Sequence, residues 1–294
     1  MLLAVLGLAV LACQEMKKEE TTAVGLPEMS REIMAKSVIY EANIRQYSPE
    51  GSFNAFAQDL PELKKLGVDI IWLMPVYPIS TTNSKGSLGS YYAVSDYTGV
   101  NPEFGTLADL KALINQAHEL GMYVILDWVP SHFPYDSHGL FMFDGANTYE
   151  YADMRKGFHP DWNSYVFNYK RGEVKSFLIS SARFWFDKFH IDGIRVDAVS
   201  SMLKLNYSRT EGQWEPNEFG GDGNLEAIAF LKDLNETIYR DFPDVQTIAE
   251  EATDWPGISQ PTFQGGLGFG MKWMMGWMHD SLDYFKIDPL FRKE

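Results

Sequence analysis

The sequence predicts an α/β fold, namely a TIM (β/α)8 barrel that is truncated after about six β/α units. From residue 36 onward, strand-like runs alternate with helix-like runs, which is the pattern of a parallel sheet with crossover helices. Three of the strand-like runs end in an acid, at Asp127, Asp197 and Glu250, and barrel strands end together at one rim. Because a closed barrel has eight units and the sequence shows no internal repeat, we expect an incomplete barrel.

The first half of the predicted barrel has clear helix boundaries. Pro61 fits the first turn of a helix, and Gly67 fits its end. Thr106 and Asp109 have the spacing of a capping box, which opens the next helix, and Gly121 ends that helix. The elements expected here are strands at residues 38–44, at 69–74 and up to 127, with helices near 60–66 and 106–120.

The second half contains a long loop insertion after the third strand. Residues 133–172 are rich in Tyr, Phe, Asp and Gly, and a loop of this length between barrel elements is usually functional. The elements expected beyond it are a helix at 174–189, a strand at 193–197, a loop at 204–224, a helix that Pro243 closes off, a strand reaching Glu250 and a sixth strand within 268–275.

The N-terminal residues are expected to lie outside the barrel. Residues 2–12 are apolar, but this run is far shorter than the ~20 residues that span a bilayer. The run precedes Cys13 and resembles a bacterial lipobox, in which the cysteine is lipidated after cleavage. We therefore predict a signal peptide at 1–13, a flexible tether at 14–33 and a partial catalytic barrel at 34–294. The alternative is an ordinary N-terminus with a buried cysteine.

The composition excludes several classes of partner. The net charge of -15 argues against nucleic acid and anionic membrane surfaces, whereas a neutral polysaccharide tolerates such an acidic protein. Eight Trp, fifteen Tyr and nineteen Phe supply flat faces for sugar rings, although most of them are expected in the core. The glycine run at 265–270 lacks the strand and helix of a dinucleotide fingerprint, so we expect no cofactor, and we predict no metal site.

The strand at 193–197 suggests how the acids are used. Successive strand residues face opposite sides, so Arg195 and Asp197 share one face and their charged ends can meet. A guanidinium beside a carboxylate lowers the pKa of that carboxylate and keeps it ionised, which suits a nucleophile. Glu250 and Glu251 are adjacent, so only one of them can face the barrel interior, and strand parity alone leaves the choice open.

Three motifs, at residues 127–132, 193–197 and 248–251, resemble the first three signature regions of the α-amylase clan, the family 13 glycoside hydrolases. The resemblance implies that Asp197 is the nucleophile of a retaining reaction and that Glu250 is its acid/base. The resemblance also implies four residues of the substrate-binding site. Tyr91 would stack on the reacting sugar and His132 would hydrogen-bond it. Arg195 would position Asp197, and Asp127 would support the site from the third strand.

The two halves of the chain resemble different members of this clan. Residues 36–128 look like secreted α-amylases, whereas residues 129–294 look like 1,4-α-glucan branching enzymes, and a chimera is one explanation. The longer second half implies α-glucan transglycosylation that creates α-1,6 branches. Two alternatives stay open, namely hydrolysis of α-1,4 bonds by an α-amylase and glucan binding by a lipoprotein without catalysis.

Several departures from the family pattern affect these expectations. The fourth signature region, a His-Asp pair at the seventh strand, is missing, so we expect the chain alone to be weakly stable and nearly inactive. Branching enzymes are cytoplasmic and usually carry an N-terminal β-sandwich, whereas a leader with Cys13 implies a membrane-anchored lipoprotein facing the periplasm or the exterior. Ser131 replaces the Asn that binds calcium in many amylases, which agrees with the absence of a predicted metal site.

Overall fold

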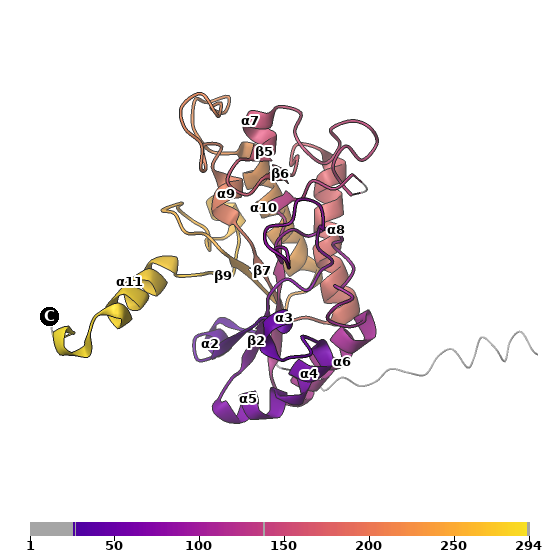
Figure 1. Ribbon diagram of the computed structural model, residues 1–294. Coiled ribbons are helices and arrows are strands. Elements are labelled where there is room, and N and C mark those ends of the chain that lie inside the picture. Colours follow the sequence, from indigo (N-terminus) through magenta and orange to yellow (C-terminus); the bar gives the residue numbers. More distant parts are fainter. Residues whose placement is uncertain (1–25, 27, 138, 293–294) are drawn as a thin grey trace, which may run out of the picture.

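A computed structural model describes residues 26, 28–137 and 139–292 of the chain (Figure 1). A parallel sheet curls through the centre of this described part, in the strand order β1-β2-β3-β7-β8-β9. This sheet is a half-barrel, so the predicted α/β fold with six strands is confirmed. Its strands are β1 (Ile39–Ala42), β2 (Ile70–Leu73), β3 (Tyr123–Trp128), β7 (Gly193–Val196), β8 (Gln246–Ala249) and β9 (Met271–Lys272).

The helices between the strands begin and end close to the predicted positions. Helix α5 (Leu60–Leu66) has a proline in its first turn and ends at Gly67, whose φ of 96° is left-handed. The predicted capping box of Thr106 and Asp109 is present at the start of α6 (Leu107–Glu119). The other helices are α2 (Arg31–Met34), α3 (Ile44–Tyr47), α4 (Phe53–Gln58), α7 (Met154–Gly157), α8 (Gly172–Phe189), α9 (Val199–Leu203), α10 (Leu225–Asp241), α11 (Met275–Lys286) and the 3-10 turns η1 (Thr262–Gln264) and η2 (Pro289–Phe291).

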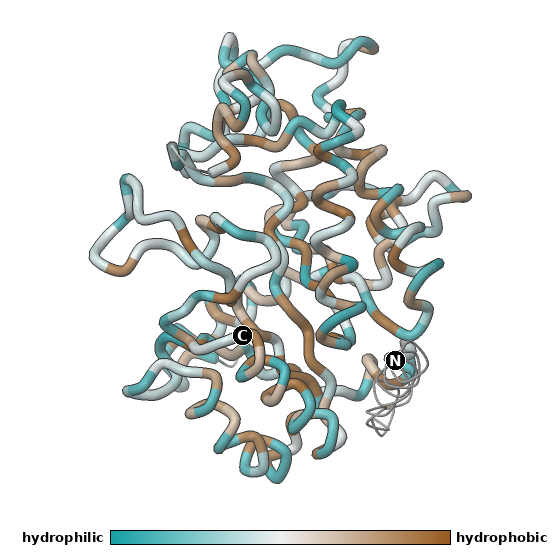
Figure 2. The backbone as a smooth tube through the Cα atoms, turned by 90° about the vertical axis from the view of Figure 1, so that its right-hand side faces the viewer, coloured by the Kyte–Doolittle hydropathy of each residue, from teal (hydrophilic) through white to brown (hydrophobic). Residues whose placement is uncertain are grey.

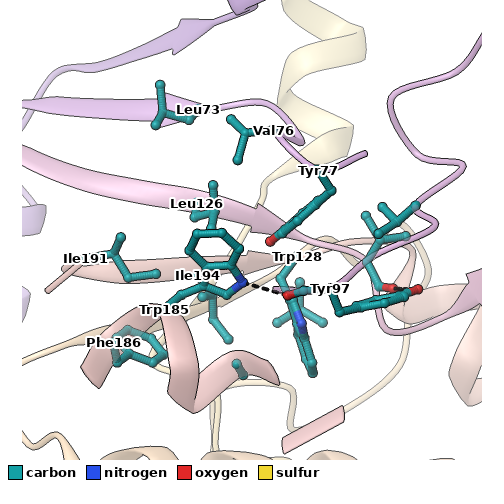
Figure 3. Close-up of a cluster of buried hydrophobic side chains, with 14 of the residues drawn as sticks. Leu73, Val76, Tyr77, Tyr97, Leu126, Trp128, Trp185, Phe186, Ile191 and Ile194 are labelled. Carbon is teal, nitrogen blue, oxygen red and sulfur yellow. Dashed lines mark hydrogen bonds between the residues drawn. The ribbon is translucent and has the colours of Figure 1, made fainter. Parts of the chain in front are cut away.

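Strand alternation divides the core between the two faces of the sheet. One face packs against the long helices through large side chains, which Figure 3 shows around Trp128 and Trp185. The indole Nε1 of Trp185 donates a hydrogen bond of 3.0 Å to the carbonyl oxygen of Tyr97, so this buried polar group is satisfied. In Figure 2 the hydrophobic residues gather along the central strands and the helix faces turned toward them. The inner face carries a smaller cluster, namely Met29, Ile70, Tyr123, Ile125 and Ile248.

The insertion after β3 contains a small sheet that was not predicted from the sequence. Strand β6 (Ser164–Val166) lies between β4 (His132–Phe133) and β5 (Phe158–His159), and both pairs are antiparallel. The hairpin between β5 and β6 pairs His159 with Ser164 in register, so their side chains lie on the same side. The long loop after the third strand is therefore partly regular, and it continues directly from the end of the barrel strand.

The ends of the described part differ from the sequence prediction. Met29 is fully buried, its amide donates to Asp244, and its carbonyl accepts from the side chain of Gln246. The packed domain thus begins before residue 34, the boundary predicted from the sequence. The predicted lipidation site, Cys13, lies outside the described residues. None of the described helices is long and apolar enough to cross a bilayer. Helix α11 projects from the rest of the chain and buries none of its side chains (Figure 1).

The packing around Trp185 predicts a large effect on stability. Trp185→Ala removes a fully buried indole and leaves a cavity, so we expect the free energy of unfolding to fall by about 3–5 kcal/mol. Urea unfolding followed by circular dichroism measures this change. Trp277→Ala is the matched control, because the Trp277 side chain is 71% exposed on α11. Equal losses in the two variants would contradict the packing described here.

Candidate active site

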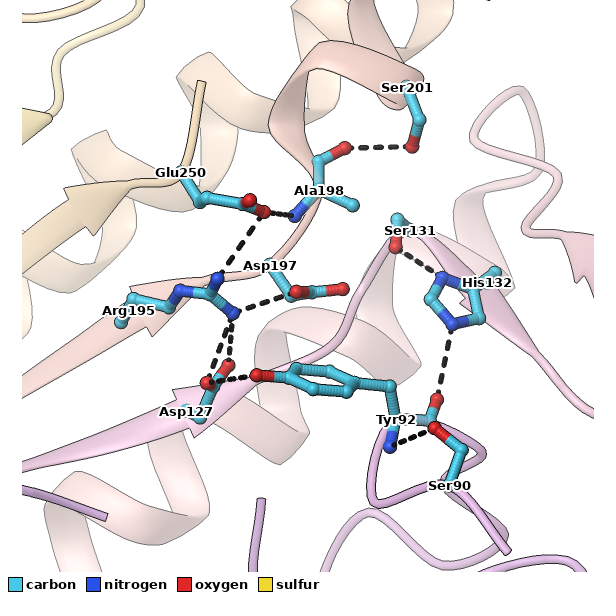
Figure 4. A network of polar contacts seen from close by, with 10 residues as sticks. All are labelled: Ser90, Tyr92, Asp127, Ser131, His132, Arg195, Asp197, Ala198, Ser201 and Glu250. Atoms are coloured by element: carbon cyan, nitrogen blue, oxygen red, sulfur yellow. Dashed lines mark hydrogen bonds and ion pairs between the residues drawn. The ribbon is translucent and has the colours of Figure 1, made fainter. Parts of the chain in front are cut away.

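Three acids meet at one guanidinium at the carboxyl ends of the central strands (Figure 4). Arg195 Nη1 contacts Asp127 Oδ1 at 2.8 Å and Asp197 Oδ1 at 2.7 Å. Arg195 Nη2 lies 3.4 Å from Glu250 Oε2. The strand register explains this convergence, because Asp127 on β3 is directly opposite Arg195 on β7, which neighbours β8. The predicted meeting of Arg195 and Asp197 on one face is confirmed.

Burial dominates the electrostatics of this cluster. Asp127 is completely buried, and burial raises the pKa of its carboxyl to about 8, although the charge of Arg195 opposes the rise. Burial also raises the pKa of Asp197, again against the lowering effect of Arg195. The sequence led us to expect that Arg195 gives Asp197 a lowered pKa. That expectation was wrong in direction, because the loss of hydration outweighs one guanidinium that two carboxylates share.

The structure resolves which of the two adjacent glutamates faces the interior. Glu250 lines a cavity, and its Oε2 accepts a 2.7 Å hydrogen bond from the amide of Ala198. Ala198 has a φ of 53°, an uncommon left-handed conformation for a residue with a Cβ, and this turn aims its amide at Glu250. Glu251 points away and is fully buried, where it pairs with Lys272 at 3.1 Å and accepts a hydrogen bond from Ser200.

His132 lies at the edge of the same cavity in a defined tautomer. Its Nε2 lies 3.1 Å from the carbonyl oxygen of Tyr92, and because a carbonyl only accepts, Nε2 carries the proton. Its Nδ1 therefore accepts a hydrogen bond of 2.7 Å from the hydroxyl of Ser131. Burial lowers the pKa of His132 to about 4, so the ring is neutral at physiological pH.

Tyr92, and not Tyr91, is the tyrosine at the site. The Tyr91 hydroxyl accepts from Asn43, its ring lies under the guanidinium of Arg45, and it does not line the cavity. Tyr92 lines the cavity, and its hydroxyl donates to Asp127 Oδ2 at 3.3 Å. The assignment of Tyr91 is corrected accordingly. The sequence could not distinguish the two neighbouring tyrosines because they lie in an irregular loop, where no strand alternation indicates which ring faces inward.

The cavity has a volume of about 360 Å³ and brings Asp197, Glu250 and His132 together. Asp127 and Arg195 do not line it. Arg195 contacts both Asp127 and Asp197, as expected of a residue that positions the nucleophile, and the assignment of Asp127 and Arg195 to substrate binding stays a prediction. None of the remaining lining residues was predicted from the sequence, and these are Ser80, Thr82, Asn83, Ser84, Lys85, Ser90, Tyr92, Ala93, Pro134, Tyr135, Trp162, Asn163, Ser164, Ala198, Ser200, Tyr207 and Ala252. Trp162 lies in the insertion after the third strand, and the many aromatic residues of that insertion were the one sequence feature that could have indicated a binding role for Trp162.

Among the described residues, no group of three or more His, Cys, Asp and Glu side chains is arranged to hold a metal ion. Ser131, the residue that stands where many amylases have a calcium-binding Asn, uses its hydroxyl to fix the His132 ring. The Ser131 hydroxyl thus orients the His132 ring, and the carboxyl groups of Asp197 and Glu250 face the cavity.

Comparison with known proteins shows which sequences this chain is similar to. The sequence model for the alpha-amylase catalytic domain matches residues 28–164. The chain is 53% identical to the 1,4-alpha-glucan branching enzyme of Aromatoleum aromaticum over 258 residues, which cover 87% of this chain and 40% of that enzyme. It is also 53% identical to the corresponding enzyme of Aquifex aeolicus over 263 residues, which cover 87% of this chain and 41% of that enzyme.

Solved structures give the same answer for the fold. An alpha-amylase from Lactobacillus plantarum is 31% identical, with a TM-score of 0.65, and the match covers 85% of this chain and 55% of that one. A maltogenic alpha-amylase from Thermotoga neapolitana is 25% identical with the same TM-score, covering 85% and 52%. Fold and site together define a β/α-barrel protein with a paired-carboxylate centre. In sequence and in fold the chain is similar to alpha-amylase catalytic domains and to branching enzymes.

The comparisons bear on two further points. The chain spans about two fifths of the length of these branching enzymes. The matches of 258 and 263 residues are longer than the roughly 165 residues that follow Val129, so they extend into the first half of the chain. The particular likeness of residues 36–128 to secreted amylases therefore remains a prediction, and one kind of relative accounts for both halves.

The neutral state of His132 makes the stability of the fold depend on pH. Its pKa is about 4 in the folded chain and 6.5 for an ordinary imidazole, so the unfolded chain binds the extra proton. Stability is therefore fully present above pH 6.5 and is lost as the pH falls from 6.5 toward 4. We expect His132→Gln to remove about 2 kcal/mol of the loss between pH 7 and pH 5.

Urea melts of both proteins at each pH measure this difference. His279→Gln is the control, because His279 lies exposed on α11 and its replacement also removes one imidazole. The same pH dependence in the wild type and in His132→Gln would contradict the assignment of a buried, neutral His132.

Proposed function

We propose that this chain carries the catalytic centre of a retaining α-glucan transglycosylase, a 1,4-α-glucan branching enzyme. The observation that carries the proposal is the pair of acids, Asp197 and Glu250, which face one cavity and contact the same guanidinium. The 53% identity to branching enzymes over most of the chain supports the choice of reaction. The substrate is an α-1,4-glucan, and the product carries an α-1,6 branch.

The first half of the reaction breaks the α-1,4 bond. A carboxylate oxygen of Asp197 attacks the anomeric carbon of the glucan and forms a glycosyl ester. The bond from that carbon to the glycosidic oxygen breaks, and Glu250 donates its proton to the departing oxygen. Arg195 holds the attacking carboxylate at 2.7 Å and supplies the positive charge that favours its ionised form.

The second half transfers the chain to a new position. Glu250, now ionised, removes the proton from the 6-hydroxyl of an acceptor glucose, and that oxygen attacks the anomeric carbon. The ester bond breaks, and Asp197 regains its carboxylate. The Ala198 amide donates a hydrogen bond to Glu250 and so fixes the position of its carboxyl group.

The other residues of the site hold the reacting sugar. His132 lines the cavity as a neutral ring whose orientation the Ser131 hydroxyl and the Tyr92 carbonyl fix. Tyr92 presents its ring to the cavity while its hydroxyl is tied to Asp127. We assign these two residues to sugar binding, and we assign Asp127 to holding Arg195 beneath Asp197.

Hydrolysis is the competing function, and the likeness to alpha-amylase structures favours it. The first half of the reaction is the same, but water replaces the sugar 6-hydroxyl in the second. Linkage analysis of the products formed from maltohexaose separates the two, because only transfer to a 6-hydroxyl creates α-1,6 bonds.

Covalent trapping tests the proposed nucleophile. The probe 5-fluoro-α-maltosyl fluoride is an activated donor whose glycosyl ester is long-lived. A single glycosylation of each protein molecule is therefore enough for detection, even if turnover is slow. We expect mass spectrometry to find one maltosyl group on Asp197, none in Asp197→Asn, and unchanged labelling in Asp254→Asn, whose side chain is 97% exposed. Binding of maltohexaose without any label in the wild type would contradict the catalytic role and would favour a non-catalytic glucan-binding protein.

The lipid anchor at Cys13, and with it the location at a membrane, is a separate proposal that rests on the apolar run at residues 2–12. Labelling of the full chain with radioactive palmitate in a bacterial host tests it. We expect label in the wild type and none in Cys13→Ala, and an unlabelled wild-type chain would contradict the proposal.

A further inference from the structure

Two aromatic rings form a wall of the cavity outside the carboxylate cluster. Trp162 stands in the hairpin between β5 and β6, and Tyr207 follows α9 in the loop that leads to α10. Both line the cavity, and their ring centroids are 5.8 Å apart at an interplanar angle of 52°. The reaction steps derived above use neither residue, although their rings come from two loops that are far apart in the sequence.

This wall lines the same cavity as the acid/base, Glu250. Burial raises the pKa of the Tyr207 hydroxyl, and the next largest cause is the charge of Glu250. Trp162 is the neighbour of His132, with ring centroids 5.0 Å apart. The wall thus begins beside His132 in the cavity that Glu250 also lines, whereas Tyr92 reaches toward Asp127, behind the nucleophile.

The cavity also contains a hydroxyl group without a hydrogen-bond partner among the described residues, that of Ser164. The Ser164 hydroxyl lines the cavity in a side chain that is nearly fully buried, and it has no hydrogen-bond partner among the described residues. Buried hydroxyls are normally hydrogen-bonded, so an unpartnered one at a cavity indicates a place where a ligand hydroxyl binds. A sugar supplies both features, namely apolar ring faces for Trp162 and hydroxyls for Ser164.

The aromatic wall is supported from behind by His159. Its ring lies 4.5 Å from Trp162 and 6.1 Å from Tyr207, and its side chain is 1% exposed. Neither ring nitrogen has a hydrogen-bond partner within the described residues. Burial lowers the pKa of His159 to about 3, so the ring packs as a neutral, flat support for the two aromatic residues.

We propose that Trp162, Tyr207 and Ser164 form the acceptor subsite, which takes a glucose unit of a second α-1,4-glucan chain. This proposal rests on the proposed function and adds to it the residues that select a sugar acceptor over water. A glucose stacked on the wall places its 6-hydroxyl near Glu250 and displaces the water that would otherwise hydrolyse the glycosyl ester.

Release of a trapped glycosyl group tests this subsite separately from bond cleavage. The full chain is labelled with 5-fluoro-α-maltosyl fluoride, freed of reagent and mixed with increasing maltotetraose, and the loss of label is followed by mass spectrometry. For Trp162→Ala we expect the half-saturating maltotetraose concentration to rise about tenfold. The half-saturating concentration is measured after labelling is complete, so it does not depend on the labelling rate, and Trp162→Phe should recover much of the affinity.

Phe263→Ala is the matched control, because Phe263 is an aromatic residue that is 84% exposed away from the cavity. An unchanged half-saturating concentration in Trp162→Ala would overturn the proposal. If the wild type takes no label, the proposed function fails, and calorimetric titration of the unlabelled chain with maltotetraose decides the subsite. Tenfold weaker maltotetraose binding in Trp162→Ala, with unchanged binding in Phe263→Ala, supports the subsite. Equal binding in the wild type and both variants overturns it.

Discussion

The site depends on one guanidinium that is shared by acids from three strands. Arg195 contacts Asp127 on β3, Asp197 at the end of β7 and Glu250 after β8, and it is itself almost fully buried. Burying several charges is costly unless each has a partner, and here the partners are fixed by strand register rather than by flexible loops. The curled sheet therefore brings the acids together, and the order of its strands determines which side chains are in contact.

The parts of this site that lie on regular strands could be predicted from the sequence. Arg195 and Asp197 are two residues apart, so alternation alone places them on one face, and the structure confirms the contact. The capping box at Thr106 and the glycine after α5 also act locally, so the helix boundaries were readable. Glu250 and Glu251 mark the limit of this reasoning, because their parity depends on where β8 ends and the following turn begins.

Features that depend on contacts between distant loops could not be predicted. Tyr91 and Tyr92 differ only in how an irregular loop turns, and only Tyr92 reaches Asp127. The pKa of Asp197 depends on how much water its surroundings exclude, which no local pattern records. The aromatic wall joins Trp162 in the insertion after β3 to Tyr207 in the loop after α9. Each of these features arises from tertiary packing, and the long insertion contributes to it as much as the barrel strands do.

The central claim is that Asp197 and Glu250 act on opposite sides of a single glycosidic bond. A crystal structure of the Glu250→Gln variant soaked with maltohexaose tests it most directly, because this variant binds the chain without completing the reaction. We predict a glycosidic oxygen beside the amide that replaces the Glu250 carboxyl and an anomeric carbon facing the Asp197 carboxylate, with the two side chains roughly 5–5.5 Å apart. A glucan bound elsewhere, or an Asp197 carboxylate turned away from the sugar, would contradict it.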